Sequence, residues 1–263
     1  DVEKQTGMEP VYDNSNSFDA AMLARLQATV GEEADKILAF TRKYAAKSTK
    51  RATYQAMEAL VHNLNTMHSR AGAQVPFTSL NYGTDTSAEG RLVSECLLLA
   101  TEAGLGNGEV SIFPIHIFKV KEGINFNPGE PNYDLFQLAI RVSAKRLFPN
   151  FSFLDAPYNK QYYQEGKPET EVAYMGCRTR VMTNVNDPSR EITYGRGNLS
   201  FTSINLPRLA IEADHDEELF YEKLHGMMEL VAQQLLDRFE IQASKHIYNY
   251  PFLMGQGVWL DSD

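Results

Sequence analysis

The sequence predicts an α/β fold, because helix-like and strand-like segments alternate along most of its 263 residues. The helix-like segments carry apolar residues three and four positions apart, whereas the strand-like ones are short and bounded by Gly, Pro, Asn or Asp. With 43% hydrophobic and 22% charged residues, the composition is that of a globular protein with a substantial core. We expect right-handed crossovers between successive strands.

Helices are predicted over most of the first 70 residues, after an extended arm. Ser17 can cap a helix over residues 18–30, and a second helix follows over 32–46. Ser48-Thr49 precede a third helix with one apolar face, formed by Tyr54, Met57, Leu60, Val61, Leu64 and Met67.

Short strands and helices alternate from residue 75 onward. Strands are expected at residues 75–81, 111–120, 150–154, 171–175 and 198–205, and the last segment, 251–260, is also strand-like. Helices are expected after Thr86-Ser87, where Leu92, Cys96 and Leu99 align, and over 132–147 and 216–248. The inward face of the last helix is expected to comprise Leu219, Leu224, Met227, Met228, Val231, Leu235 and Phe239. We expect a single domain overall, in which a helical segment, residues 1–50, packs on a body formed by residues 51–263.

Composition narrows the class of protein. A net charge of −9 disfavours a nucleic-acid-binding surface, which needs clustered Lys and Arg, and no apolar run approaches the length of a membrane span. Two cysteines cannot form a disulfide framework, and the six histidines lack metal-ligand spacing, so we expect no metal site and a cytoplasmic location. Because the chain begins with Asp1 rather than Met, we expect it to be a piece of a longer polypeptide.

The two cysteines differ in their surroundings. Cys96 lies on the apolar face of a predicted helix and is expected to be an inert core residue. Cys177 lies in the segment Met175-Gly-Cys-Arg-Thr-Arg180, among small and cationic residues, and a Gly-rich turn leads to Asn198 about twenty residues later. Two arginines would favour a thiolate or hold an anionic ligand. The alternative is a free cysteine at a strand end without a chemical role.

Of two further polar segments, only the second is a candidate ligand-binding site. The turn Gly104-Leu-Gly-Asn-Gly108 follows a helix, whereas a dinucleotide-binding turn follows a strand, so its glycines are expected to supply positive φ angles. Asn65 near a helix end can cap that helix or contact a ligand. Thr78 and Ser79 are small enough to allow a ligand to approach closely.

Several segments, in this order, resemble the anaerobic, oxygen-sensitive ribonucleoside-triphosphate reductases, which are the class III glycyl-radical enzymes. The resemblance runs from about residue 50 to the end and rests on His62-Asn-Leu-Asn-Thr-Met67, Ala73-Gln-Val-Pro-Phe-Thr-Ser-Leu-Asn81, Leu147-Phe-Pro-Asn-Phe-Ser-Phe153, Met175-Gly-Cys-Arg-Thr-Arg180 and Gly195-Arg-Gly-Asn-Leu-Ser-Phe-Thr-Ser-Ile-Asn-Leu206. It implies part of a ten-stranded α/β barrel with a finger loop that carries the active cysteine.

The resemblance also implies roles for individual residues. Cys177 matches the cysteine that forms a transient thiyl radical and removes the ribose 3′ hydrogen. Asn198 would orient the substrate or formate near the ribose hydroxyls, and Met175 would pack beside the thiol. Substrate contacts are expected from Asn65, Thr78, Ser79 and Arg178.

Cofactors and partners follow from the same resemblance. The glycyl radical would come from a segment outside this chain, formate is the implied reductant, and zinc would belong only to the family's C-terminal region, which this chain lacks. The implied partners are a ribonucleoside triphosphate, nucleotide effectors, a radical S-adenosylmethionine activase and a second copy in a homodimer, whereas neither nucleic acid nor a membrane is expected.

Two alternatives stay open. One is another glycyl-radical enzyme, similar to formate lyases; that group tends to have two adjacent cysteines, whereas Cys177 stands between Gly176 and Arg178. The other is a catalytically silent module that binds nucleotides or mediates dimerisation, because this chain lacks the radical segment.

Overall fold

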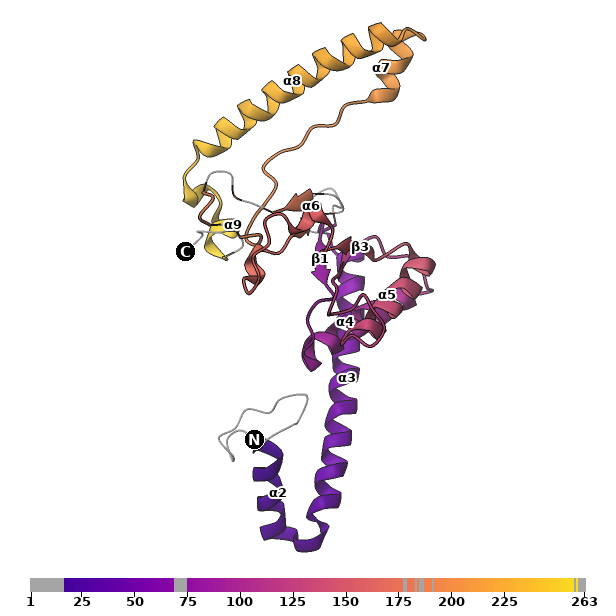
Figure 1. The fold of residues 1–263 in the computed structure, drawn as a ribbon, viewed down its shortest axis with the longest axis vertical. Helices are drawn as coiled ribbons and strands as arrows, with labels where there is room; N and C mark the ends of the chain where they lie inside the picture. The colour runs from indigo at the N-terminus through magenta and orange to yellow at the C-terminus, as the bar shows by residue number, and fades with distance from the viewer. Residues whose placement is uncertain are drawn as a thin grey trace. The chain divides into compact units, whose positions relative to one another are not determined.

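The structure, a computed structural model, describes residues 17–68, 75–176, 179–182, 184, 187–190, 192–257 and 259. The chain divides into two compact units, residues 1–192 and residues 193–263 (Figure 1). The packing of residues 1–50 on the rest of the chain stays a prediction. In the described ranges, no helix is both long and apolar enough to cross a membrane.

The first unit is built on a parallel sheet of three strands in the order β1-β2-β3, which confirms the α/β class. The strands are β1 (Ser79–Tyr82), β2 (Ile115–Val120) and β3 (Asn150–Phe153). The first two each begin four residues later than the sequence suggests. Pro76 and Pro114 explain this difference, because a proline has no N–H to donate to a strand ladder.

The helices of the first unit are α2 (Ser17–Val30), α3 (Ala34–Thr66), α4 (Ala88–Ala103) and α5 (Tyr133–Arg146), with a 3-10 turn at Gly31–Glu33. The predicted break before residue 50 is wrong, since α3 runs through Ser48 and Thr49 without interruption. Ala and Lys residues on both sides of this pair favour the helix strongly enough to offset two weaker formers. Figure 1 shows α2 folded back along the first half of α3.

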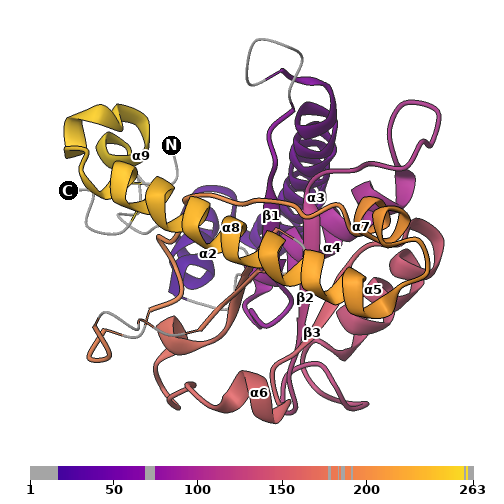
Figure 2. The ribbon, with the colours of Figure 1, turned by 90° about the horizontal axis from the view of Figure 1, so that it is seen from above.

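The core of this unit lies where α4 and α5 meet the sheet (Figure 2). Its buried members are Leu98, Phe118, Val120, Leu135, Ala139 and Val142. On the other side of α4, Val61 of α3 packs against Leu97 and Ala100. Cys96 is fully buried on α4, which confirms its predicted place in the core.

The ends of α4 follow the sequence signals. The Ser87 hydroxyl accepts a hydrogen bond from the Gly90 N–H at 3.0 Å and caps the helix. Gly104 ends it at φ +82°, where an added Cβ would lie 2.5 Å from the Glu109 carbonyl oxygen. Gly108 has φ +89°, so the predicted positive φ angles are confirmed at Gly104 and Gly108, whereas the prediction is wrong for Gly106, which has no positive φ.

The first unit continues through α6 (Pro157–Lys160) and a 3-10 turn (Pro168–Thr170) to an antiparallel hairpin. The hairpin consists of β4 (Ala173–Met175) and β5 (Thr179–Val181). Its first strand confirms the later part of the strand predicted at 171–175.

The second unit is helical and departs from the sequence predictions in several places. It contains α7 (Leu206–Ala213), α8 (Glu217–Ala243), a 3-10 turn (Ile247–Asn249) and α9 (Pro251–Gly255). The predicted strand at 198–205 is wrong, since these residues form no strand. The closing strand-like segment begins as a helix, because Pro251 occupies the first helical position, where proline is well tolerated. Helix α8 ends at Ala243 rather than near Tyr248.

Helix α8 also buries less than its apolar pattern predicts. None of its residues is buried, and Met228 and Phe239, which were expected to face inward, are 55% and 51% exposed. The other predicted members of the inward face are half-buried, namely Leu219, Leu224, Met227, Val231 and Leu235.

Candidate active site

The hairpin β4–β5 carries the residues on either side of Cys177. Met175, which is half-buried, pairs with Thr179 across the hairpin. Gly176 begins the connection with φ +61°, a conformation that suits glycine. Cys177 and Arg178 follow and lie outside the described residues. The predicted position of Cys177 at the tip of a loop therefore stays a prediction.

Side chains of β1 bind the outer edge of this hairpin. The Asn81 amide nitrogen donates to the Tyr174 carbonyl at 2.8 Å, and the Tyr174 N–H donates to the Asn81 amide oxygen at 2.9 Å. The Gly176 N–H donates to the Ser79 hydroxyl at 3.0 Å. Ser79, predicted as a substrate contact, thus lies at the residue that precedes Cys177. Thr78 adjoins it and donates to the Pro76 carbonyl at 3.2 Å.

A charged cluster holds the base of the same hairpin to β2. Glu171, just before β4, accepts from Lys119 at 2.9 Å and lies 3.3 Å from the Lys121 ammonium. Lys121 also donates to the Tyr163 hydroxyl at 3.2 Å and lies over the Tyr163 ring. Burial opposes the charge of Lys121, but the hydrogen bond to Tyr163 and the Glu171 carboxylate outweigh it and raise the pKa of Lys121. The cluster is mostly buried and favours a fixed geometry.

Arg180, one of the two arginines near Cys177, is engaged on β5 by residues of α6. Its guanidinium donates to the Asn159 amide oxygen at 3.1 Å and to the Tyr158 carbonyl at 3.3 Å, and it lies over the Tyr158 ring. The Arg180 guanidinium therefore already uses part of its hydrogen-bonding capacity on these neighbours. The role predicted for Arg178 stays a prediction.

Asn65, predicted as a substrate contact or a helix cap, bridges α3 to the segment before β2. Its amide nitrogen donates to the carbonyls of Val61 and Phe113, both at 2.6 Å. Its oxygen accepts from the N–H groups of Ile112 at 2.8 Å and Phe113 at 3.1 Å. All four hydrogen-bonding positions of the amide are used, so a substrate contact by Asn65 would have to replace one of these bonds.

Two residues beside the hairpin were missed by sequence reasoning. Asn81 was noted only as the end of a strand, although its position two residues after Ser79 places both side chains on one face of β1. Phe77 is 70% exposed and packs edge-on to Phe113, with ring centroids 5.1 Å apart. Its ring would lie 3.2 Å from a Cβ at Gly176, which leaves little space for a side chain there.

Asn198 lies in the second unit and is exposed. The preceding Gly197 packs on the indole of Trp259, because a Cβ at this position would lie 2.5 Å from the indole nitrogen. Arg238 of α8 donates to the segment that follows, at Ser200, Phe201 and Thr202, and Gln242 donates to the Leu199 carbonyl. These bonds explain why residues 199–202 run beside a helix instead of joining a sheet. The predicted approach of Asn198 to Cys177 stays a prediction.

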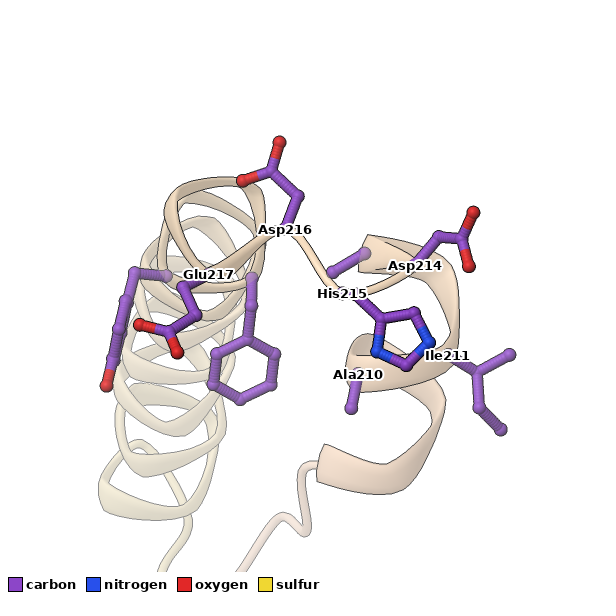
Figure 3. A pocket seen from close by; sticks show the side chains of 9 residues that line it. Ala210, Ile211, Asp214, His215, Asp216 and Glu217 are labelled. Atoms are coloured by element: carbon purple, nitrogen blue, oxygen red, sulfur yellow. The ribbon is translucent and has the colours of Figure 1, made fainter.

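The second unit also has a hollow of about 670 Å³ at the turn between α7 and α8 (Figure 3). Asp214 and His215 there have φ angles of +47° and +69°. The Asp216 carboxylate accepts from the Leu219 N–H at 3.0 Å and caps α8, whose first turn also carries Glu217 and Glu218. Within the described part of the chain, no group of three or more His, Cys, Asp or Glu side chains could hold a metal ion.

Comparison with known proteins shows the family of this chain. The family model described as anaerobic ribonucleoside-triphosphate reductase matches residues 18–263. The chain belongs to this family. The match confirms the resemblance drawn from the five segments between residues 62 and 206.

Individual reductases of the family align with most of the chain. The anaerobic ribonucleoside-triphosphate reductase of Escherichia coli (strain K12) is 36% identical over 196 residues, which are 74% of this chain and 26% of the relative. The reductase of enterobacteria phage T4 is 31% identical over 234 residues, which are 87% of this chain and 38% of the relative. The chain thus spans about a quarter to two fifths of the length of the curated relatives that it matches.

Proposed function

We propose that this chain forms the central part of the catalytic barrel of an anaerobic ribonucleoside-triphosphate reductase, with Cys177 as the hydrogen-abstracting residue. The observation that carries the proposal is the hairpin β4–β5, whose connection contains Cys177 and whose edge is bound to the parallel sheet by Ser79 and Asn81. A thiol that reacts with a bound sugar must be held in a fixed position, since the reaction is efficient only when the reacting atoms are held in contact and aligned. The remaining strands of a ten-stranded barrel would come from other parts of the polypeptide.

The chemistry converts a ribonucleoside triphosphate and formate into a 2′-deoxyribonucleoside triphosphate, carbon dioxide and water. A Cys177 thiyl radical takes the 3′ hydrogen atom, and the 2′ hydroxyl leaves as water after it gains a proton. Formate is oxidised to carbon dioxide and supplies the two electrons and the hydrogen that form the new C2′–H bond. The 3′ hydrogen atom then returns from the thiol, which regenerates the thiyl radical. Sulfur suits this step because its S–H bond is weak enough to yield a radical and strong enough to make C–H abstraction reversible.

Other residues of the chain have supporting roles in this proposal. Asn198 orients the ribose hydroxyls or formate, Met175 packs beside the thiol, and Thr78, Ser79 and Arg178 lie at the substrate. Asn65 has an indirect role, because its amide binds Ile112 and Phe113 and so fixes the segment before β2. The glycyl radical, its activase, nucleotide effectors, a second copy and any zinc site would be supplied by or bound to other parts of the full enzyme.

Replacement of Cys177 tests the proposal in the complete enzyme. Under anaerobic conditions, with activase and formate, Cys177→Ala should form a glycyl radical, detected by electron paramagnetic resonance, but no deoxyribonucleotide. Cys96→Ala is the matched control, because Cys96 is buried in the core and should not affect turnover. Deoxyribonucleotide formation by Cys177→Ala would exclude the proposal. Nucleotide binding by calorimetry, with no turnover in the wild type either, would favour the silent module instead.

A further inference from the structure

We propose that Asn81 and Ser79 are positioning residues, which set the orientation of the hairpin β4–β5 and therefore of Cys177. This inference rests on the function proposed above for Cys177. It goes beyond that function because the two side chains hold the hairpin in its orientation and need not touch the substrate.

The geometry of β1 supports this assignment. Residues two apart on a strand point to the same face, so Ser79 and Asn81 project together from β1. Their partners on the hairpin, Gly176 and Tyr174, are also two residues apart and run in the opposite direction. Because the spacings match, the Ser79 and Asn81 side chains both bind β4 along the same edge. We call this pair of side chains the rail.

The chemistry of the Asn81 amide adds to the argument. A primary amide offers a donor and an acceptor, which are the two groups that a peptide unit of a neighbouring strand would offer. Asn81 uses both on the same residue, Tyr174, at 2.8 and 2.9 Å. The Asn81 side chain therefore makes the two hydrogen bonds that a neighbouring strand would make with Tyr174, and it fixes the position of β4 along β1.

The rail and the Glu171 cluster hold different ends of β4. The ion pairs of Glu171 with Lys119 and Lys121 fix the start of the strand. Ser79 binds Gly176, which directly precedes Cys177. Loss of the rail should therefore leave the base of β4 attached while the end nearest Cys177 gains freedom. A displacement of about 1 Å can cost roughly a hundredfold in rate, so a small change in this mount would reduce turnover.

Amide hydrogen exchange in the 263-residue chain tests the rail without any need for activity. In Asn81→Ala, the Tyr174 amide should exchange roughly tenfold faster or more, because its acceptor is lost. In Asn81→Asp, that amide should stay protected, because a carboxylate still accepts. Ser79→Ala should release the Gly176 amide, and Ser79→Thr should restore its protection. Asn107→Ala, a change on the exposed turn after α4, is the control and should leave both amides unchanged. Unchanged exchange of Tyr174 in Asn81→Ala would overturn the inference.

Turnover of the complete enzyme tests the consequence for Cys177. Asn81→Ala should lower kcat roughly ten- to a hundredfold, with KM for the ribonucleoside triphosphate within about threefold of wild type and an unchanged yield of glycyl radical. A normal kcat in Asn81→Ala, alongside loss of turnover in Cys177→Ala, would refute the positioning role alone. Turnover by Cys177→Ala would instead refute the proposed function, and the positioning role with it, while the exchange data would still decide whether the rail exists.

Discussion

The charge state of a single buried side chain, His116, follows from its contacts. Thr101 donates its hydroxyl hydrogen to the Leu97 carbonyl at 2.8 Å, so its oxygen is left to accept from His116 Nε2–H at 3.2 Å. His116 Nδ1 then accepts from the Tyr82 hydroxyl at 3.1 Å. The neutral ring with the proton on Nε2 satisfies all three residues, which tie β2 to α4 and β1. Burial lowers the pKa of His116 to about 4 and raises that of Tyr82.

This low pKa predicts a loss of stability in mild acid. The unfolded chain binds a proton at His116 near pH 6.5, whereas the folded chain does so only near pH 4. The contribution of neutral His116 is therefore complete above pH 6.5 and disappears as the pH falls towards 4, by roughly 3 kcal/mol in total. We expect the free energy of unfolding, measured by urea titration, to fall between about pH 7 and 4.5.

His116→Gln should flatten this pH dependence whatever its absolute stability, because glutamine does not titrate. An equally steep fall in the variant would show that other groups cause it.

The role of a residue could be predicted from the sequence only where the residues that it contacts are close to it in the sequence. Cys96 was placed correctly in the core because its apolar neighbours lie on its own helix. Asn65 could not be assigned a role from local sequence, since its partners Ile112 and Phe113 lie nearly fifty residues further along the chain. The same holds for Asn81, which meets Tyr174 ninety-three positions away.

At the scale of elements, the predictions succeed where burial fixes the pattern. Strand β2 and helices α4 and α5 were found because each has a buried face, and the Gly, Pro, Asn and Asp residues around β1 and β3 indicated those two strands. Helix α7 was missed, although Asn205 before Pro207 is a strong helix-start signal and the Asn205 side chain does accept from the Arg208 N–H. The β-branched and aromatic residues of 198–205 indicated a strand, but hydrogen bonds from α8 determine its conformation instead.

The continuity of α3 predicts how the helix responds to proline. Thr49 lies in the interior of α3, so Thr49→Pro should remove a helix hydrogen bond and lower the free energy of unfolding by about 3 kcal/mol. Circular dichroism should also report a loss of helix, whereas Thr49→Ala should be neutral or slightly stabilising. If the helix began at this point, as the sequence suggested, proline would be tolerated there, and an unchanged stability would support that interpretation.

At the scale of the whole molecule, the chain belongs to the anaerobic reductase family and spans only part of the length of its curated relatives. It aligns with 26% of the length of the Escherichia coli relative, and its two compact units carry different parts of the proposed site. The first unit holds the hairpin around Cys177 and the residues that mount it, and the second holds Asn198. Sequence motifs identified the family because they lie in both units and keep their order. Local patterns could not define the division at residue 193, since it depends on long-range packing.

The most direct test of the account is an experimental structure of the complete enzyme with a bound ribonucleoside triphosphate. The account predicts the Cys177 sulfur roughly 3.5 Å from the ribose C3′ atom, with the Asn198 side chain at the hydroxyls of the same sugar. A Cys177 sulfur on the outer surface, or a ribose bound out of reach of both residues, would contradict it.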